Sequence, residues 1–506
     1  MKKHVLAFIA LVCSLTASAH DFKVNGIYYN ITSETDKTVE VTYRGTWYHS
    51  YSNEYSGSIT LSATVTYNGV EYSVTSIRDL AFHSCSSLTS ITIPESVTSI
   101  GNYAFAYCSS LTAITLPEGV TSIGDYAFLG CSSLTSITIP ASVTSIGNYA
   151  FCECSSLTTI TIPENSQLTS IGERTFYGCS SLTAITLPEG VTSIGGSAFS
   201  GCSSLTVINI PESVTSIGDE AFYYCSSLTS ITIPEDVTSI GNSTFLNCSS
   251  LTAITLPEGV TSIGDYAFLS CSSLTSITIP ESVTSIGEGA FFDCSSLTSI
   301  TIPENSQLTS IGERTFYGCS SLTTITIPAS VSYIGNEAFR ECSSLTSITI
   351  PEGVTSIGEY AFLGCRSLTA ITLPASVSSI GDYAFDWCYN LTTINIPEGV
   401  TRVEIGTFRQ CSSLKSITLP ASVEYLGDMA FARSGLKEIT SLATKAPGLG
   451  IAVFDGLNDV KINHLTGSNF STWKAALAPK ADVNGDGEVD VADITAVIRT
   501  IKEREQ

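Results

Sequence analysis

The sequence predicts an α/β repeat solenoid that is predominantly β, on the evidence of two long periodicities and a short apolar alternation. Fifteen of the 17 cysteines, from Cys85 to Cys411, follow one another at steps of 23 residues with two steps of 25. Fifteen of the 17 prolines, from Pro94 to Pro420, keep the same period. Residues at a fixed period repeat one structural role, so the chain is a stacked array, not a set of globular domains of about 150 residues each.

A typical repeat spans residues 131–153 and reads CSSLTSITIPASVTSIGNYAFCE. Ile137 and Ile139 flank a threonine, and this alternation indicates a strand with one buried face. Pro140 ends the strand because proline has no N–H to donate to a neighbouring strand. Residues 147–151 fit one turn of helix, and the glycine that opens them indicates either a positive φ or a close approach of the neighbouring backbone.

One repeat alone cannot bury its apolar side chains, so the repeats must stack and the array needs a cap at each end. Residues 88–108, LTSITIPESVTSIGNYAFAYC, resemble the BspA-like (Treponema-type) leucine-rich repeat family of bacterial surface proteins at the Ile-Pro, Ile-Gly, Ala-Phe and Cys positions. The resemblance covers about 365 of the 506 residues. It implies a leucine-rich repeat right-handed superhelix with a parallel sheet on its concave side, and a role in adhesion to host proteins or other cells.

Departures from the repeat give the expected domain boundaries. The start of the chain has aromatics, alternating strand patterns and an Asn-Gly hairpin turn at residues 68–69, which predict a β-rich N-terminal cap or, alternatively, an independent binding module. The expected organisation is a signal peptide (1–19), the N-terminal cap (20–72), a solenoid of about 16 turns of 23 residues (73–440), a C-terminal cap and linker (441–479) and a dockerin-like half-repeat (480–506).

The first 19 residues predict export. Residues 2–3 are lysines, residues 5–15 are apolar, and residues 17–19 form a small Ala-Ser-Ala cleavage site. A lipoprotein signal at Cys13 is the weaker alternative because the bulky Val12 precedes it. The mature protein is therefore expected to be secreted or displayed on the bacterial cell surface.

The charge balance excludes two classes of partner. The chain carries 46 acidic and 22 basic residues, a formal charge of −24, and loss of the two signal-peptide lysines gives −24 − 2 = −26. Affinity for nucleic acid and for anionic lipid depends on Lys and Arg neutralising phosphates, so neither is an expected partner. After residue 19 no apolar run approaches the roughly 20 residues of a spanning helix, so membrane insertion is not expected either.

The segment 482–493, DVNGDGEVDVAD, has the spacing of a calcium loop, with side-chain oxygens at loop positions 1, 3, 5, 9 and 12, a backbone carbonyl at 7 and glycine at 6. The expected Ca²⁺ ligands are Asp482, Asn484, Asp486, Glu488, Asp490 and Asp493. Aspartate at the last position, with no helix entering the loop, resembles a dockerin half-repeat and implies a cohesin-like partner. A calcium-locked C-terminal element and an acidic turn before a helix are the alternatives.

The cysteine ladder fits buried thiols better than disulfides. Stacked neighbours would lie about 4.8 Å apart, but their Cβ vectors run parallel and do not converge as a disulfide requires. The ladder is therefore expected to hold small, reduced core residues. Cys152 stands outside the ladder at a variable position and is the expected reactive thiol.

Two sets of surface positions are candidates for binding. The outward strand positions are almost all Thr, Ser or Ala, which lack the Trp, Tyr and Arg anchors typical of interaction hot spots. The variable pair before each ladder cysteine is richer in such residues, which are either ligand contacts or residues tolerated at an exposed corner. The expected binding residues are Tyr107, Tyr177, Tyr223, Tyr224, Phe292, Tyr317 and Trp387.

Acidic residues recur at two further positions. Glu follows the repeat proline in 11 of 15 repeats, and the residue after the repeat glycine is acidic in nine. Such rows are expected to form a solvated, solubilising edge or to attract cations.

Catalysis finds no support, because the few histidines are scattered and no nucleophile elbow, phosphate loop or zinc spacing is present, so no enzyme is expected. The first functional hypothesis is a secreted or cell-surface binding protein for adhesion to host extracellular proteins or other cells. The alternative is a non-catalytic scaffold or binding subunit of an extracellular glycan-processing assembly, docked through the calcium loop. A passive spacer is the third. The expected ligands are thus extracellular proteins or glycans.

Overall fold

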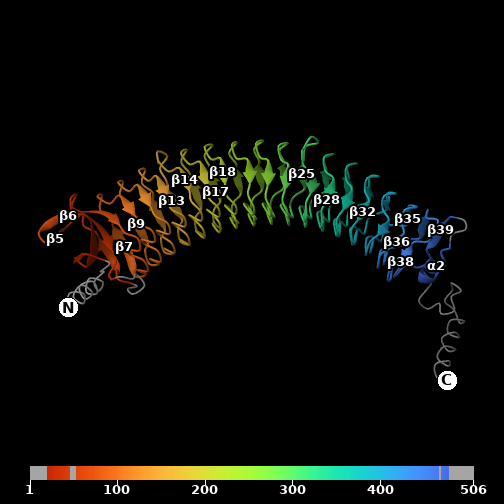
Figure 1. Cartoon of the computed structure of the whole chain (residues 1–506), viewed down its shortest axis with the longest axis horizontal. Coiled ribbons are helices and arrows are strands. Elements are labelled where there is room, and N and C mark those ends of the chain that lie inside the picture. Colours follow the sequence, from red (N-terminus) through yellow and green to blue (C-terminus); the bar gives the residue numbers. More distant parts are fainter. Residues whose placement is uncertain (1–19, 46–52, 466–468, 478–506) are drawn as a thin grey trace, which may run out of the picture. The chain divides into compact units, whose positions relative to one another are not determined.

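The computed structural model describes residues 20–45, 53–465 and 469–477. The chain divides into two compact units, Met1–Gly259 and Val260–Gln506, and each is described by itself. The expected signal peptide (1–19) and calcium loop (482–493) lie outside the described residues. Both units are parallel-sheet solenoids, with about 17 turns in the described chain (Figure 1). This confirms the prediction of a repeat solenoid that is predominantly β.

The first unit begins with strands that extend its two rows of repeat strands. These are β1 (Phe22–Val24), β2 (Ile27–Ser33), β3 (Thr38–Thr42), β4 (Gly57–Thr60), β5 (Thr64–Tyr67) and β6 (Val70–Ile77). β1, β2 and β3 pair antiparallel, and β5 and β6 form a hairpin that turns at Asn68 and Gly69, both with positive φ. β6 runs parallel to the first strand of one row and β4 to the first strand of the other, so the solenoid begins on paired backbone.

Each later repeat of the first unit adds one strand to each row. One row comprises β7 (Leu88–Thr92), β9 (Ala113–Thr115), β11 (Ser136–Thr138), β13 (Thr159–Thr161), β15 (Ala184–Thr186), β17 (Val207–Asn209), β19 (Ser230–Thr232) and β21 (Ala253–Thr255). The other comprises β8 (Ser99–Ile100), β10 (Ser122–Ile123), β12 (Ser145–Ile146), β14 (Ser170–Ile171), β16 (Ser193–Ile194), β18 (Ser216–Ile217) and β20 (Ser239–Ile240). Equivalent residues face each other, as Ile137 faces Ile160, so the register is one whole repeat.

The second unit has the same two rows. One comprises β23 (Ser276–Thr278), β25 (Ser299–Thr301), β27 (Thr324–Thr326), β29 (Ser347–Thr349), β31 (Ala370–Thr372), β33 (Thr393–Ile394), β35 (Ser416–Leu419), β37 (Glu438–Ser441) and β39 (Lys461–His464). The other comprises β22 (Ser262–Ile263), β24 (Ser285–Ile286), β26 (Ser310–Ile311), β28 (Tyr333–Ile334), β30 (Ser356–Ile357), β32 (Ser379–Ile380), β34 (Arg402–Val403), β36 (Tyr425–Leu426) and β38 (Gly448–Leu449). The helix α2 (Ser471–Leu477) follows.

The repeat strands continue past residue 440, although the periodic cysteine and proline end at Cys411 and Pro420. β39 pairs with β37, and β38 pairs with β36, both in parallel. The ring of Phe454 also stacks on that of Phe431 at 6.3 Å. Backbone pairing and the apolar core carry the solenoid further than the sequence motif does.

The helical turn expected at residues 147–151 is not formed. Tyr149 has a φ of 58°, in the left-handed region, which breaks any run of right-handed helix. Its N–H donates to Glu173 O at 2.8 Å, and the N–H of Phe151 donates to Thr175 O at 2.9 Å. The segment therefore directs its backbone hydrogen bonds to the next repeat, and the prediction of a helix here is wrong.

The repeat glycine is required by close approach, which resolves the alternatives left by the sequence. Gly147 does not have a positive φ, but a Cβ there would collide with the backbone N of Asp125 in the preceding repeat. At Gly124 the same Cβ would lie 2.6 Å from the backbone N of Asn102. The backbones of successive repeats touch at these glycines, so a side chain has no room there. Gly312, whose nearest atom would lie 3.4 Å from an added Cβ, is less restricted, and Arg78 and Glu404 stand at the same position in two repeats.

Phenylalanine rings stack through the centre of each unit. In the first unit the rings of Phe105 and Phe128 lie 5.3 Å apart at an angle of 5°, and both are fully buried. This offset-stacked arrangement is favourable for aromatic pairs. Tyr55 packs against the first ring of the stack, Phe82, at 4.8 Å, so an aromatic side chain from the N-terminal segment closes that end of the core.

The stack in the second unit is closed by the helix α2. Phe454 lies 5.6 Å from the ring of Trp473, which is fully buried. The Nε1–H of Trp473 donates to the backbone oxygen of Pro447 at 3.0 Å, so the indole is satisfied as it covers the core.

The ladder cysteines are buried thiols, and every described cysteine is free. The thiol of Cys131 donates a hydrogen bond to Phe105 O of the preceding repeat at 3.1 Å, and the same contact recurs from Cys154 to Phe128 O and from Cys202 to Phe176 O, each at 3.2 Å. Burial raises the pKa of Cys131 well above its usual value. Cys152 is only 6% exposed and burial raises its pKa to about 11, so the expectation of a reactive thiol there is wrong.

We predict that a chromogenic thiol reagent, used without reductant, labels few cysteines in the folded protein and most of them after denaturation. Folding buries the thiols without oxidising them, so unfolding alone should expose them. Reduced and denatured protein provides the full count for comparison. A count near zero in the unreduced, denatured protein would show that the ladder is oxidised.

Candidate interaction surface

The outward threonines of the strand face act as a hydrogen-bond ladder between repeats. Thr112 Oγ1 donates to Thr89 O at 3.3 Å, and Thr135 Oγ1 donates to Thr112 O at the same distance. The equivalent contacts recur in the second unit, as from Thr346 to Thr323 at 3.2 Å. The uniform Thr positions thus have a structural use and, as expected from the sequence, present no aromatic or arginine anchor.

The row after the repeat glycine is also partly structural. Asn102 Oδ1 accepts the N–H of Asp125 at 2.8 Å, and Asp125 Oδ1 accepts the N–H of Asn148 at 2.8 Å. Asp382 does the same for the N–H of Ile405 at 3.0 Å. Asp and Asn reach the next repeat because their side chains are short, so an interpretation of this row as a purely solvated edge is incomplete.

The row after the repeat proline is different, because its glutamates are exposed and form no ion pair within the described residues. Examples are Glu118 in the first unit and Glu352 in the second. This row matches the solvated edge that the sequence predicts.

The predicted binding residues lie at the corner of each repeat, between the repeat glycine and the ladder cysteine. In the first unit Tyr107, Tyr177 and Tyr224 are exposed by 46%, 38% and 47%. Tyr223 is half-buried with its ring 4.5 Å from that of Tyr224, and Tyr107 lies edge-on to His83 at 5.7 Å.

In the second unit the predicted residues form closer contacts. The rings of Phe292 and Tyr317 stack at 4.3 Å and 3°, and both are half-buried. Trp387 is half-buried too, and its Nε1 is covered without a hydrogen-bond partner among the described residues. The structure therefore places these residues in a row but not in one pocket.

The backbone explains why corner side chains lie along the row. Two residues of each corner, such as Tyr126 and Gly130, have positive φ of 57° and 66°. A Cβ on Gly130 would lie 2.8 Å from the ring of Tyr107 in the preceding repeat. A side chain at the position of Tyr107 thus extends over the next repeat, and a glycine there makes room for a ring.

A second aromatic row, at the second residue after the repeat glycine, was not among the predicted sites. The rings of Tyr103 and Tyr126 stack at 4.4 Å, and those of Tyr126 and Tyr149 at 4.6 Å. In the second unit Tyr360 and Tyr383 stack at 5.2 Å. The recurring Gly-x-Tyr-Ala-Phe string was the signal for this row, but only the left-handed backbone brings its tyrosines to the surface.

Arginines join the two rows in the second unit. The guanidinium of Arg340 lies 5.2 Å from the ring of Tyr317 and 5.8 Å from that of Tyr360, within cation–π range. Arg409 lies 5.2 Å from the ring of Tyr383. We call this set the second-unit ridge: Phe292, Tyr317, Arg340, Tyr360, Tyr383 and Arg409.

One end of the ridge is held by a buried ion pair. The carboxylate of Asp386 is fully buried and accepts hydrogen bonds at 3.1 Å from Nε of Arg409 to both of its oxygens. Burial raises the pKa of Asp386, and Arg409 opposes that shift.

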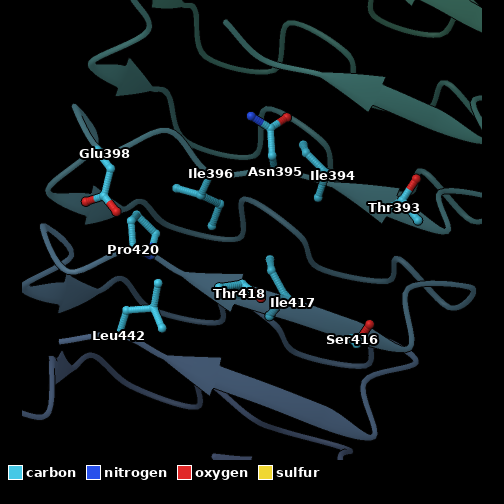
Figure 2. Close-up of a pocket in the computed structure, with 10 residues that line it drawn as sticks. All are labelled: Thr393, Ile394, Asn395, Ile396, Glu398, Ser416, Ile417, Thr418, Pro420 and Leu442. Carbon is cyan, nitrogen blue, oxygen red and sulfur yellow. The ribbon is translucent and has the colours of Figure 1, made fainter. Parts of the chain in front are cut away.

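A hollow of about 350 Å³ opens between β33 and β35 (Figure 2). Asn395 replaces the usual strand contact with its amide, accepting the N–H of Leu373 at 2.8 Å and donating to Leu373 O at 2.7 Å. β33 pairs with β31 and has no pairing with β35 among the described strands, and Ile394 is left half-buried. Figure 2 shows Thr and Ser hydroxyls beside Ile and Leu side chains, with no aromatic or arginine anchor, so the hollow is the weaker candidate.

Comparison with known proteins agrees with this fold. The family described as BspA type leucine rich repeat region matches residues 75–168, 164–274, 261–362 and 332–457, which is most of the chain. The chain belongs to the BspA-type leucine-rich repeat family. Proteins of this type generally act as non-catalytic scaffolds that bind protein ligands, and no catalytic family is indicated.

Solved structures include similar bacterial proteins. A leucine-rich repeat protein from Bacteroides ovatus is 33% identical, with a TM-score of 0.64 over 80% of this chain and 96% of that one. A leucine rich cell surface protein from Faecalibacterium prausnitzii is 27% identical over 91% of this chain and 97% of that one, with a TM-score of 0.38. A T. pallidum leucine-rich repeat protein is 23% identical over 55% and 90%, with a TM-score of 0.28. Curated proteins give no match.

No described helix of this leucine-rich repeat protein has the length and apolar character needed to cross a bilayer. Within the same residues no group of three or more His, Cys, Asp or Glu is placed to hold a metal ion.

We predict that Arg409→Met destabilises the protein by about 3–5 kcal/mol at neutral pH, because it leaves the Asp386 carboxylate buried without its partner. Without the guanidinium, the pKa of Asp386 rises further above its value in the unfolded chain. The cost is therefore present above that raised pKa and is lost as the pH falls through it. Thermal unfolding of wild type and variant across the acid range measures the difference.

The matched control for this prediction is Arg366→Met. Arg366 is half exposed and pairs with Glu341 at 3.5 Å, so its loss should change stability by less than about 1 kcal/mol at any pH. An Arg409→Met variant whose destabilisation does not depend on pH would contradict the role assigned to Asp386.

Proposed function

We propose that this protein is exported to the bacterial surface or its surroundings and binds extracellular proteins there, in adhesion to host proteins or to other cells. The observation that carries the proposal is the corner surface, where tyrosines and arginines recur from repeat to repeat in exposed or half-exposed positions. Tyr and Arg are among the residues that dominate the binding energy of protein interfaces. The threonine face has no such anchors.

Two observations support export. Residues 1–19 have the pattern of a signal peptide, and the chain's repeats resemble those of a family of bacterial surface proteins. A repeat array also suits this function physically. Each repeat contributes a few corner side chains, and successive repeats add area without a new fold, so an interface can reach the roughly 800 Å² per partner of a stable complex.

The test is binding of purified chain, beginning at residue 20, to a panel of immobilised host matrix proteins and soluble glycans. We expect binding to at least one matrix protein, retained after deletion of residues 480–506 and in EDTA, because the corner surface needs neither the calcium loop nor a metal. Binding to glycans alone, or to no member of the panel, would count against the proposal.

A second candidate function, supported by the spacing of residues 482–493, is a non-catalytic subunit of a glycan-processing assembly. In this proposal Asp482, Asn484, Asp486, Glu488, Asp490 and Asp493 bind one Ca²⁺ and the loop docks to a cohesin-like partner. Calorimetric titration of the full chain with Ca²⁺ is expected to show one site that is absent from a chain ending at residue 479. Recruitment by a cohesin that is lost in EDTA would favour this function over adhesion.

A further inference from the structure

We infer that the second-unit ridge is a docking surface for a cationic protein segment, rich in Arg or Lys, and not for a glycan. The inference rests on the proposed function and adds to it the place of binding and the chemistry of the partner. Three properties of the ridge carry it: continuity, the covering of its ring faces, and the sign of its unpaired charge.

The ridge is continuous over successive repeats. Phe292 and Tyr317 stack at 4.3 Å, Arg340 lies over both Tyr317 and Tyr360, and Tyr360 stacks on Tyr383 at 5.2 Å. Arg409 completes the row beside Tyr383. These aromatic and guanidinium groups hold one another in place, so a partner meets a preorganised surface and little side-chain entropy is lost on binding.

The faces of the rings are covered by the ridge itself. Phe292 and Tyr317 are parallel within 3°, as are Tyr360 and Tyr383. The ring of Tyr383 also lies over Gly406, whose missing Cβ makes room for it. A sugar ring packs flat against an open aromatic face, whereas this ridge presents ring edges and phenol hydroxyls, which suit hydrogen bonds to protein groups.

The arginines of the ridge already have carboxylate partners. Arg340 Nη1 lies 3.0 Å from Glu337 Oε2, and Arg409 pairs with the buried Asp386. They are therefore not available as unpaired cations for an acidic ligand.

The carboxylates beside the ridge are less occupied. Glu359 precedes Tyr360 in the chain, and the backbone N–H of Tyr360 donates to Asp382 O at 2.8 Å. Burial, with smaller contributions from Tyr383, Glu359 and Asp382, raises the pKa of Tyr360, and neither carboxylate forms an ion pair within the described residues. Asp382 uses Oδ1 for the N–H of Ile405 and keeps Oδ2 for a partner. Two available carboxylates beside phenol hydroxyls match guanidinium and ammonium groups, and the chain's charge of −24 attracts such a partner from a distance.

The experiment uses the full chain and three probes: a 12-residue peptide of alternating Arg and Gly, the same peptide with Glu for Arg, and cellohexaose. We expect the arginine peptide to bind and the other two not to bind. The variant pair Glu359→Gln with Asp382→Asn should weaken binding roughly tenfold, as two charge pairs of about 0.7 kcal/mol each imply. The Asn retains the Oδ1 acceptor, so this variant keeps the contact to the next repeat.

The matched control removes the same charge from the row after the repeat proline, as Glu352→Gln with Glu398→Gln. It is expected to leave binding of the arginine peptide within about twofold of wild type. Equal weakening by both pairs would show general attraction to an acidic chain and overturn the inference. Cellohexaose binding that Tyr360→Ala with Tyr383→Ala abolishes, at an unchanged melting temperature, would make the surface a glycan site and overturn it too.

Binding to a matrix protein distinguishes this inference from the proposed function. If a matrix protein binds wild type and both charge variants equally, the proposed function stands, but the ridge is not the surface that performs it. Binding of the arginine peptide at the ridge, without binding of any matrix protein, keeps the ridge as a cationic-segment site and removes the adhesion partner.

Discussion

Much of the structure depends on the contact between successive repeats at the corner, where at most repeat glycines two backbones approach too closely to admit a Cβ; Gly312 has more room, and Arg78 and Glu404 occupy the same position in two repeats. That approach sets the spacing and register of each unit, because Gly124 and Gly147 can lie against the preceding repeat in only one position. With the register set, each atom of a repeat lies over its equivalent in the next. Strands then pair residue for residue, and phenylalanine rings stack nearly parallel.

Registered stacking explains why so much of the sequence is uniform. A Thr hydroxyl, a Cys thiol and an Asp or Asn side chain each reach one acceptor or donor of the neighbouring repeat. Those side chains are fixed by contacts between repeats, so they contribute little to the recognition of a ligand. The corner side chains that extend along the row are free of that constraint, and they are where Tyr, Trp and Arg occur. The residues that stabilise the stack and the residues of the proposed binding surface thus occupy different positions of the same repeat.

The strands, the buried cysteines and the terminating prolines were predictable because they depend on apolar periodicity and on proline's missing N–H. The corner was not, since Tyr149 and residues like it adopt positive φ without the glycine that usually marks it. The tyrosine row and the Asp and Asn contacts follow from that backbone, so both were missed. The sequence did not predict that residues 441–464 continue the repeat fold, because they lack the repeat motif. There, backbone pairing extends the sheet and the Phe454 ring extends the core. Cys152 is buried although Tyr177 at the same repeat position is 38% exposed, and the repeat pattern did not predict that difference.

The most direct test of this account compares two adjacent glycines in one corner. A Cβ on Gly195 would lie 2.7 Å from the backbone N of Glu173, whereas a Cβ on Gly196 would lie 3.4 Å from Asp219 O, an ordinary contact. Thermal and denaturant unfolding of Gly195→Ala and Gly196→Ala should show a loss of about 3 kcal/mol or more for the first and a change within about 1 kcal/mol for the second. Equal effects of the two substitutions would contradict the claim that backbone contact between repeats sets the register.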